Sequence, residues 1–142
     1  KLNKIKNRSG PISVIAPNRS TAIDWMFVKK NQKATIKDKL KNGNTVIAPI
    51  KNNICSALIA GNENTVGVRV PNHLFCKILS RLFPNPITST SVNRTGEKPL
   101  TKPDDISNEF KNDIDLIIDD GVINGVGSRI FLFENGSWKQ LR

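Results

Sequence analysis

Two pairs of polar side chains in the sequence have the types and the spacing to bind an anionic or nucleotide ligand. Lys6 and Arg8 stand two residues apart, and Ser91 and Asn93 repeat that spacing at the end of a strand-like segment. Residues i and i+2 of an extended chain point to the same face, so each pair can address one ligand. Lysine offers a point charge and arginine a planar fork, which suit phosphate oxygens, whereas serine and asparagine both donate and accept hydrogen bonds. Taken alone, Lys6 and Arg8 are more often solvated surface charges, and Ser91 and Asn93 more often ordinary turn residues.

Two further polar groups lie later in the chain. Thr65 and Arg69 share one face of the strand-like TVGVRV, and Ser128 with Arg129 follows the glycine-rich stretch 121–127. A lone edge-strand cation would explain Arg69. A hairpin loop would explain the glycines, because no helix follows them as a dinucleotide-binding fingerprint requires. The sequence has no Walker motif and no arrangement of serine, histidine and acid that indicates nucleophilic catalysis. None of these groups decides the function by itself.

The charge of the chain points to an anionic partner. The 142 residues include 22 Lys and Arg against 12 Asp and Glu, a formal net charge of +10. Residues 1–60 hold 12 of the basic groups and two acids, so the excess lies there, and residues 61–142 are balanced. Such a distribution attracts nucleic acid, nucleotides or acidic lipid. The size and the 37% apolar content predict one globular domain, residues 1–142.

Membrane, secreted and metal-binding classes receive no support from the composition. No apolar run approaches the roughly 18–20 residues that span a bilayer, and no signal-peptide pattern is present. Cys55 and Cys76 could form one disulfide, but reduced thiols in a cytoplasmic protein are favoured. With His73 as the only histidine, we expect no metal site. We therefore expect a cytoplasmic protein that makes no membrane contact.

The apolar periodicity predicts a mixed α/β protein, since strands and helices do not alternate strictly. We expect helices capped by Ser20 and by Asn72, the latter with an apolar face over 74–83. The remaining expected elements are helices over 34–41 and 104–111, strands over 11–16, 45–50, 54–60, 65–70, 87–91 and 115–118, and a hairpin of 128–133 with 137–141 around Asn135-Gly136.

Read in order, the motifs resemble those of the YrdC-like family, the threonylcarbamoyl-AMP synthases. STSVNRTG (residues 89–96) is similar to the family's S-T-S-A-N-x-S-G, and VRVPNH (residues 68–73) is similar to V-R-x-P-x-H. The K-x-R and S-x-N pairs together form the family's characteristic tetrad. The resemblance covers essentially the whole chain.

The resemblance implies both a fold and a reaction. The fold would be a twisted sheet of mixed parallel and antiparallel strands that curls, with its helices, around a large, concave, basic cavity. The reaction would be the nucleotidyl transfer that joins L-threonine, bicarbonate and ATP into threonylcarbamoyl-adenylate and releases pyrophosphate, with Mg²⁺ accompanying ATP. A separate transfer complex would then modify an adenosine of tRNA.

The resemblance also implies roles for individual residues, carried over by position, with no metal ligand among them. The catalytic tetrad would be Lys6, Arg8, Ser91 and Asn93. The ATP contacts would be Arg8, Thr65, Ser91 and Arg142, and the threonine contacts would be Arg69, Ser89 and Ser128.

The chain departs from the family pattern at its start. The family's N-terminal strand and its P-T-[DE]-T-x-Y-G-L segment, which supplies a threonine-binding residue, are not in the given sequence, so the 142-residue chain alone could be inactive. The alternative is a double-stranded RNA or tRNA-binding module of the same fold without synthase activity. Six Phe, two Trp and no Tyr offer few platforms for base stacking.

Overall fold

The computed structural model describes residues 1–7, 9–125 and 127–142, and the chain divides into two compact units. The small unit consists of Lys1–Ser9 and Ser91–Gly127. The sheet unit consists of Gly10–Thr90 and Ser128–Arg142. Each unit therefore joins segments that are far apart in the sequence.

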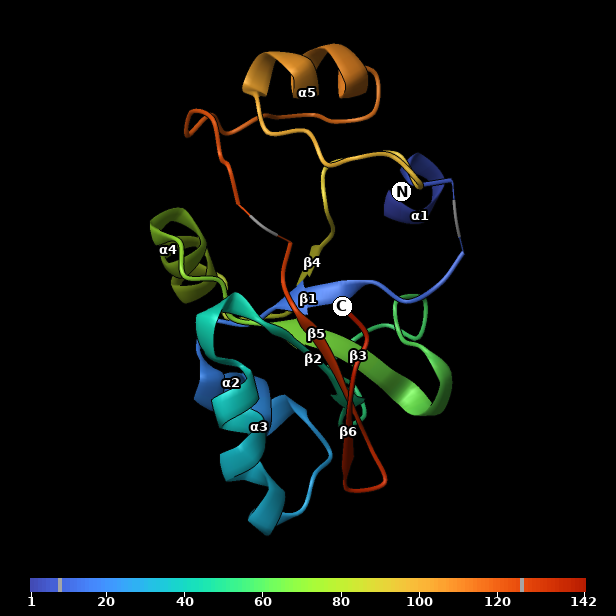
Figure 1. Cartoon of the computed structure of the whole chain (residues 1–142), viewed down its shortest axis with the longest axis vertical. Helices are drawn as coiled ribbons and strands as arrows, with labels where there is room; N and C mark the ends of the chain where they lie inside the picture. The colour runs from blue at the N-terminus through green and yellow to red at the C-terminus, as the bar shows by residue number, and fades with distance from the viewer. Residues whose placement is uncertain (8, 126) are drawn as a thin grey trace. The chain divides into compact units, whose positions relative to one another are not determined.

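The sheet unit is built on one six-stranded mixed sheet (Figure 1). Its spatial order is β4-β1-β3-β2-β5-β6, in which β1 pairs with β3 and β2 with β5 in parallel while the other neighbours are antiparallel. The predicted mixed α/β sheet is confirmed. The strand bounds are β1 (Ser13–Ile15), β2 (Thr45–Pro49), β3 (Thr65–Arg69), β4 (Ile87–Ser89), β5 (Ile130–Glu134) and β6 (Ser137–Gln140).

The two faces of this sheet differ in their covering. Side chains alternate along each strand, so Val14, Val46 and Val68 share one face, and all three are fully buried in the core. Helices α2 (Arg19–Trp25) and α3 (Lys33–Lys39) supply the other side of that core through buried apolar residues. Most side chains of the opposite face stay partly accessible, with Thr45 as a buried exception. Polar residues on strands can therefore reach a ligand only from the second face.

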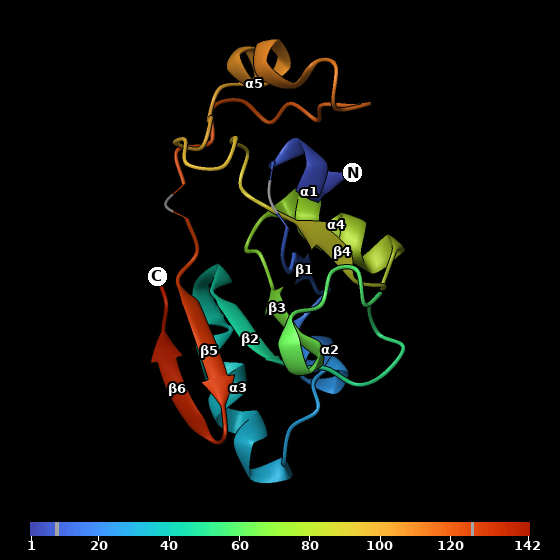
Figure 2. The same ribbon diagram turned by 90° about the vertical axis from the view of Figure 1, so that its right-hand side faces the viewer.

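The turns of the sheet unit follow the sequence signals closely. Asn42 and Gly43, at φ of 56° and 70°, end α3 through the short 3₁₀ turn Lys41–Gly43. Asn135 and Gly136, at φ of 50° and 81°, join β5 to β6. Positive φ at both central residues is the geometry of a tight hairpin turn, so the predicted hairpin is confirmed, and Figure 2 shows its strands side by side.

Two predicted strands are absent from the described residues. The stretch 54–60 forms turns, because β2 already pairs with β3 on one side and β5 on the other and leaves no edge for it. Its one backbone link to the segment before β1 is the Ile12 N–H donating to Ile59 O at 3.0 Å. The stretch 115–118 has no ladder partner, and it leads into a turn in which Asp119 Oδ1 accepts from Gly121 N–H at 2.8 Å.

Two predicted helix caps are displaced. The cap of α2 is Asn18, whose Oδ1 accepts from Thr21 N–H at 2.9 Å, and Ser20 lies inside the helix. Helix α4 (Leu74–Leu82) begins after His73 rather than Asn72, because the Asn72 side chain instead accepts from Lys77 Nζ.

Helix α4 has the predicted apolar face, but that face is exposed in the structure. Its large side chains are at least one-third exposed, with Leu82 at 80%, and the one buried residue of the helix is Ser80. The complete exposed set is Leu74, Phe75, Ile78, Leu79, Leu82 and Phe83.

The small unit has two helices and no strand among its described residues. Helix α1 (Leu2–Ile5) is one turn long, and α5 (Pro103–Phe110) matches the predicted helix to within a residue. Proline in its first turn needs no hydrogen-bond partner, and Asp104 and Asp105 suit the positive end of the helix dipole. Two further 3₁₀ turns, Lys30–Gln32 and Asn62–Asn64, lie in the sheet unit. In the part of the chain that the structure describes, no helix has both the length and the apolar character to cross a bilayer.

Candidate functional site

Lys6 lies buried in the small unit and binds the S-x-N segment. Its side chain is only 5% exposed, and Nζ donates to Asn93 Oδ1 and to Asn93 O at 2.6 Å each and to Ser91 O at 3.0 Å. An ammonium group has three hydrogens, and these acceptors use all of them. Thr95 Oγ1 donates to the backbone oxygen of Lys6 and closes the cluster. The structure therefore brings together two motifs that lie 85 residues apart in the sequence.

The S-x-N segment is fixed by its own side chains. Ser91 Oγ donates to Asn93 Oδ1 at 2.6 Å, so both side chains lie on one side of the turn. Asn93 Nδ2 donates to the backbone oxygens of Arg94 and Glu97, both at 2.8 Å. Because the asparagine amide uses its oxygen for Lys6 and its nitrogen for the following turn, the conformation of the loop depends on this one side chain.

Arg94 ties the loop to the rest of the small unit, a role that the sequence prediction missed. Its guanidinium donates to Glu109 Oε1 and Asp113 Oδ2, both at 2.8 Å, and to the backbone oxygen of Ile5 at 3.0 Å. The group also lies over the ring of Phe110, 4.7 Å from its centre. The hydrogen bonds to Glu109 and Asp113 raise the pKa of Arg94 above its ordinary value. The sequence contained two signals for this role: Arg94 directly follows S-x-N, and Glu109 and Asp113 are acids four residues apart.

Arg69 is a cation of the sheet unit, and its surroundings differ from those of Lys6. It ends β3, opposite Thr45 of β2 and Ile15 of β1. Its Nε is buried and has no hydrogen-bond partner among the residues that the structure describes. Burial lowers the pKa of Arg69; the Cys76 thiol opposes that effect, and the positive charge of Arg142 adds to it. A buried donor without an acceptor costs free energy, so this position favours an incoming anion.

Hydroxyl groups and a second arginine belong to the same end of the sheet. Thr45 Oγ1 and Ser128 Oγ are 3.0 Å apart and share a hydrogen bond. Arg142 Nε donates to Ser128 O at 3.0 Å, which brings the last residue of the chain to this cluster. Thr45 is the register partner of Arg69, so the strand pairing itself assembles the group. We call Arg69, Thr45, Ser128 and Arg142 the arginine cluster.

Two candidate residues of the sheet unit, Thr65 and Ser89, stand apart from the arginine cluster. Thr65 begins β3, four residues and about 13 Å along the strand from Arg69. Its Oγ1 donates to Asn62 O at 2.8 Å. Ser89 lies on β4 as the register partner of Ser13, two strands away from β3 in the sheet order. Arg8 lies outside the described residues.

Both cysteines are free, and burial raises the pKa of each thiol. For Cys76 the neighbouring Arg69 partly opposes this rise, whereas Cys55 has no such neighbour. Among residues 1–7, 9–125 and 127–142, no group of three or more His, Cys, Asp or Glu side chains is placed to hold a metal ion.

The structure described so far is that of a mixed α/β protein, and comparison with known families identifies which one. The model of the Sua5/YciO/YrdC family, described as "Telomere recombination", matches residues 1–142. The chain belongs to this family, and the resemblance seen in its motifs is confirmed.

Curated relatives of the chain include threonylcarbamoyl-AMP synthases. A threonylcarbamoyl-AMP synthase of Idiomarina loihiensis is 28% identical over 96 residues, covering 61% of this chain and 51% of the relative. One of Serratia proteamaculans is 31% identical over 88 residues, covering 62% of this chain and 46% of the relative. The chain thus spans about half the length of the curated relatives it matches.

Solved structures share the fold. Sua5 of P. abyssi, crystallised with L-threonine, matches 99% of this chain and 42% of its own with a TM-score of 0.85 and 23% identity. E. coli YciO matches 99% of this chain and 69% of its own with a TM-score of 0.87 and 20% identity. The predicted fold class is confirmed, while the large basic cavity stays a prediction.

Proposed function

We propose that this chain is a threonylcarbamoyl-AMP synthase or a part of one. Its substrates would be L-threonine, bicarbonate and ATP, and its products threonylcarbamoyl-adenylate and pyrophosphate, the former used by a transfer complex to modify an adenosine of tRNA. Family membership and relatives of about 30% identity that carry the synthase name support this assignment.

The observation that carries the proposal is the unpartnered Nε of Arg69. A planar guanidinium with a buried free donor matches a carboxylate, which accepts two parallel hydrogen bonds and neutralises the charge. The carboxylate of L-threonine is such a group, and the P. abyssi Sua5 of the same fold was solved with L-threonine. The hydroxyl of Ser128, 3.0 Å from that of Thr45, would serve the polar remainder of the amino acid, with Ser89 as a third contact.

The two arginines of the cluster suit more than one anion. Arg142 is exposed, and its positive charge repels that of Arg69. Anionic ligands would relieve this repulsion. We assign Arg142, with Arg8, Thr65 and Ser91, to ATP. Lys6 has a different task in this proposal, because its ammonium is already saturated by acceptors of its own unit. It would hold Ser91 and Asn93 in place as a positioning residue.

Charge stabilisation would account for most of the catalysis. The amino group of threonine adds to bicarbonate with loss of water to give a carbamate. A carbamate oxygen then attacks the α-phosphorus of magnesium-bound ATP, and the bond to the β-phosphate oxygen breaks to release pyrophosphate. Each reactant carries an anionic group, namely the carboxylate of threonine, bicarbonate and the phosphates of ATP, so cations that hold them together would lower the barrier by positioning and by neutralising charge. No side chain is assigned as a general base.

Pyrophosphate release tests the proposal. With ATP, bicarbonate and threonine present we expect release, and omission of either threonine or bicarbonate should abolish it. Serine in place of threonine is the matched control for the side-chain contacts. Because the chain spans half of its relatives, threonine binding should also be measured directly by calorimetry. Absence of both threonine binding and threonine-dependent release would sink the assignment.

A further inference from the structure

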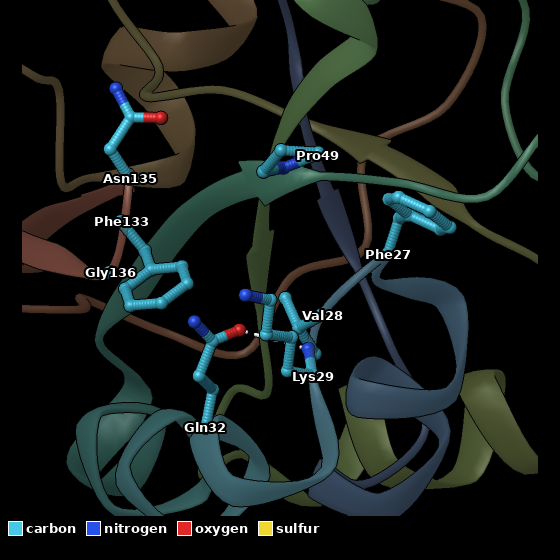
Figure 3. Close-up of a pocket in the computed structure, with 8 residues that line it drawn as sticks. All are labelled: Phe27, Val28, Lys29, Gln32, Pro49, Phe133, Asn135 and Gly136. Atoms are coloured by element: carbon cyan, nitrogen blue, oxygen red, sulfur yellow. Dashed lines mark hydrogen bonds between the residues drawn. The ribbon is translucent and has the colours of Figure 1, made fainter.

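A pocket with polar and aromatic lining lies at the other end of the sheet from the arginine cluster. It is an open hollow of about 670 Å³ between the segment that follows α2 and the β5–β6 hairpin (Figure 3). It includes Pro49, the end of β2 opposite to Thr45. All of its lining belongs to the sheet unit: Phe27, Val28, Lys29, Gln32, Pro49, Phe133, Asn135 and Gly136.

Two phenylalanines stand on opposite sides of this pocket in Figure 3. Phe133 is buried and packs against Trp138 with ring centres 4.8 Å apart, so it forms a fixed wall. Phe27 is 74% exposed, yet its backbone is held by its N–H donating to Pro49 O at 2.8 Å. A large aromatic side chain presented to solvent from a fixed backbone has no packing role of its own. It offers a free face on which a flat ring can stack.

The floor of the pocket presents a hydrogen-bond donor. Gln32 Oε1 accepts from Lys29 N–H at 2.8 Å, which fixes the direction of the amide. Gln32 Nε2 then faces the hairpin, 4.0 Å from the position that a Cβ on Gly136 would occupy. Within the described residues, this nitrogen has no protein acceptor. An oriented amide between aromatic walls is suited to the edge of a heterocyclic base.

Positive charge is concentrated in the segment that forms one side of the pocket. The sheet unit has 14 Lys and Arg against four acids, so it contains all ten excess charges of the chain. Lys29 lines the pocket, and Lys30 and Lys33 are close to Gln32 in the sequence; all three are exposed and have no ion-pair partner among the described residues. Lys37 follows Lys33 at four-residue spacing, so it extends the charge along one side of α3. The Asp38 carboxylate pairs with Lys41 alone, and Glu134 is the acid next to the hairpin turn.

We propose that this pocket binds one unpaired base of a single-stranded nucleic acid, with the adjoining phosphates on Lys29, Lys30 and Lys33. The base would stack on Phe27, present its edge to Gln32 Nε2 and be backed by Phe133. Unpaired lysines attract a polyanion of any kind, but a walled aromatic pocket among them selects one that carries flat rings. The site is separate from the arginine cluster and needs neither ATP nor threonine.

The test is binding of a labelled dodecamer of oligoadenylate to the full chain, without ATP or threonine. Phe27→Ala should weaken binding at least fivefold, because stacking of one base is lost. Phe75→Ala, which removes a partly exposed phenylalanine from α4, is the matched control and should leave binding unchanged. Lys29→Gln with Lys33→Gln should reduce the slope of log affinity against log salt concentration by about 0.7 for each phosphate that is no longer neutralised.

Four results would overturn the proposal. One is equal affinity of Phe27→Ala and the unsubstituted chain. The second is a duplex of the same length bound as tightly as the single strand, which would mean that only phosphates are recognised. The third is binding to vesicles of acidic phospholipid with no binding of the oligonucleotide. Phe27→Trp, which keeps a ring at the site, should retain affinity, and its failure would count equally against stacking.

Discussion

The two cations at the centre of the candidate sites have opposite environments. Lys6 of the small unit is buried, and each of its three hydrogens has an acceptor within the unit. Arg69 of the sheet unit has a buried nitrogen without any acceptor among the described residues. A saturated cation stabilises the fold that supplies its acceptors, whereas an unsaturated one is stabilised by a ligand. In the proposed function this contrast makes Lys6 a positioning residue and Arg69 a binding residue, although both come from motifs of the same family pattern.

The same contrast holds for net charge. The small unit has eight basic and eight acidic residues and uses several of them on each other, as Arg94 does with Glu109 and Asp113. The sheet unit holds the entire excess of ten. The attraction to anions that the sequence indicates is thus a property of the sheet unit. The two sites at which we propose that anions bind are the arginine cluster and the pocket beside Phe27.

The largest effect on ligand binding is expected from substitution of Arg69, the cation without an acceptor. Arg69→Met keeps much of the length of the side chain and removes its charge and donors. We expect threonine affinity, measured by calorimetry, to fall roughly a hundredfold, because a carboxylate loses its charged partner. The melting temperature should not fall, since the substitution removes a cation whose Nε is buried without an acceptor.

Arg69→Lys is the control for geometry as opposed to charge. A lysine restores the charge without the planar fork, so it should recover only part of the affinity. Unchanged threonine affinity in Arg69→Met would show that the free nitrogen does not mark the carboxylate site.

A smaller effect, on stability rather than binding, is expected at Lys6. Lys6→Met leaves the acceptors of Ser91 and Asn93 unsatisfied, at a cost of about 2 kcal/mol. The cost should appear locally as faster hydrogen exchange of the Leu100 amide, which donates to Val92 O at 2.8 Å, by about thirtyfold. The Val46 amide of the buried sheet should keep its exchange rate.

Lys4→Met is the matched variant for Lys6, because Lys4 is an exposed lysine of the same short helix. It should leave the exchange of both amides unchanged. If the two methionine variants behave alike, the burial and saturation of Lys6 do not stabilise the small unit.

Motif order and turn chemistry in the sequence were sufficient to predict the family, the mixed sheet and the Asn135-Gly136 hairpin. The failures have physical causes that lie outside local sequence. The stretch 54–60 reads as a strand, but both edges of β2 are already occupied by β3 and β5. An apolar face predicts burial, yet the face of α4 is exposed.

The candidate site shows the same limit. Spacing predicted that Ser91 and Asn93 share a side, and their side chains are hydrogen-bonded. Spacing also placed Thr65 and Arg69 on one face, but β3 is only as long as this spacing, so the two residues lie at its opposite ends. The burial of Lys6 and the unpartnered Nε of Arg69 depend on contacts across the sequence, so no local pattern indicates them.

The smallest expected effect tests the charge of Arg69 through its neighbour. Burial raises the pKa of Cys76, and the positive charge of Arg69 opposes that rise. Arg69→Met removes the opposition, so the Cys76 pKa should rise further, the thiolate fraction at fixed pH should fall, and alkylation by iodoacetamide should slow by less than about tenfold. Cys55, whose pKa is raised by burial alone, is the reference within the same molecule and should react at an unchanged rate. Saturating threonine should slow Cys76 in the unsubstituted chain, since a bound carboxylate neutralises Arg69, and should have no effect in Arg69→Met. If threonine slows both chains equally, the ligand shields the thiol without contacting Arg69, and the contrast between a saturated and an unsaturated cation loses its functional meaning.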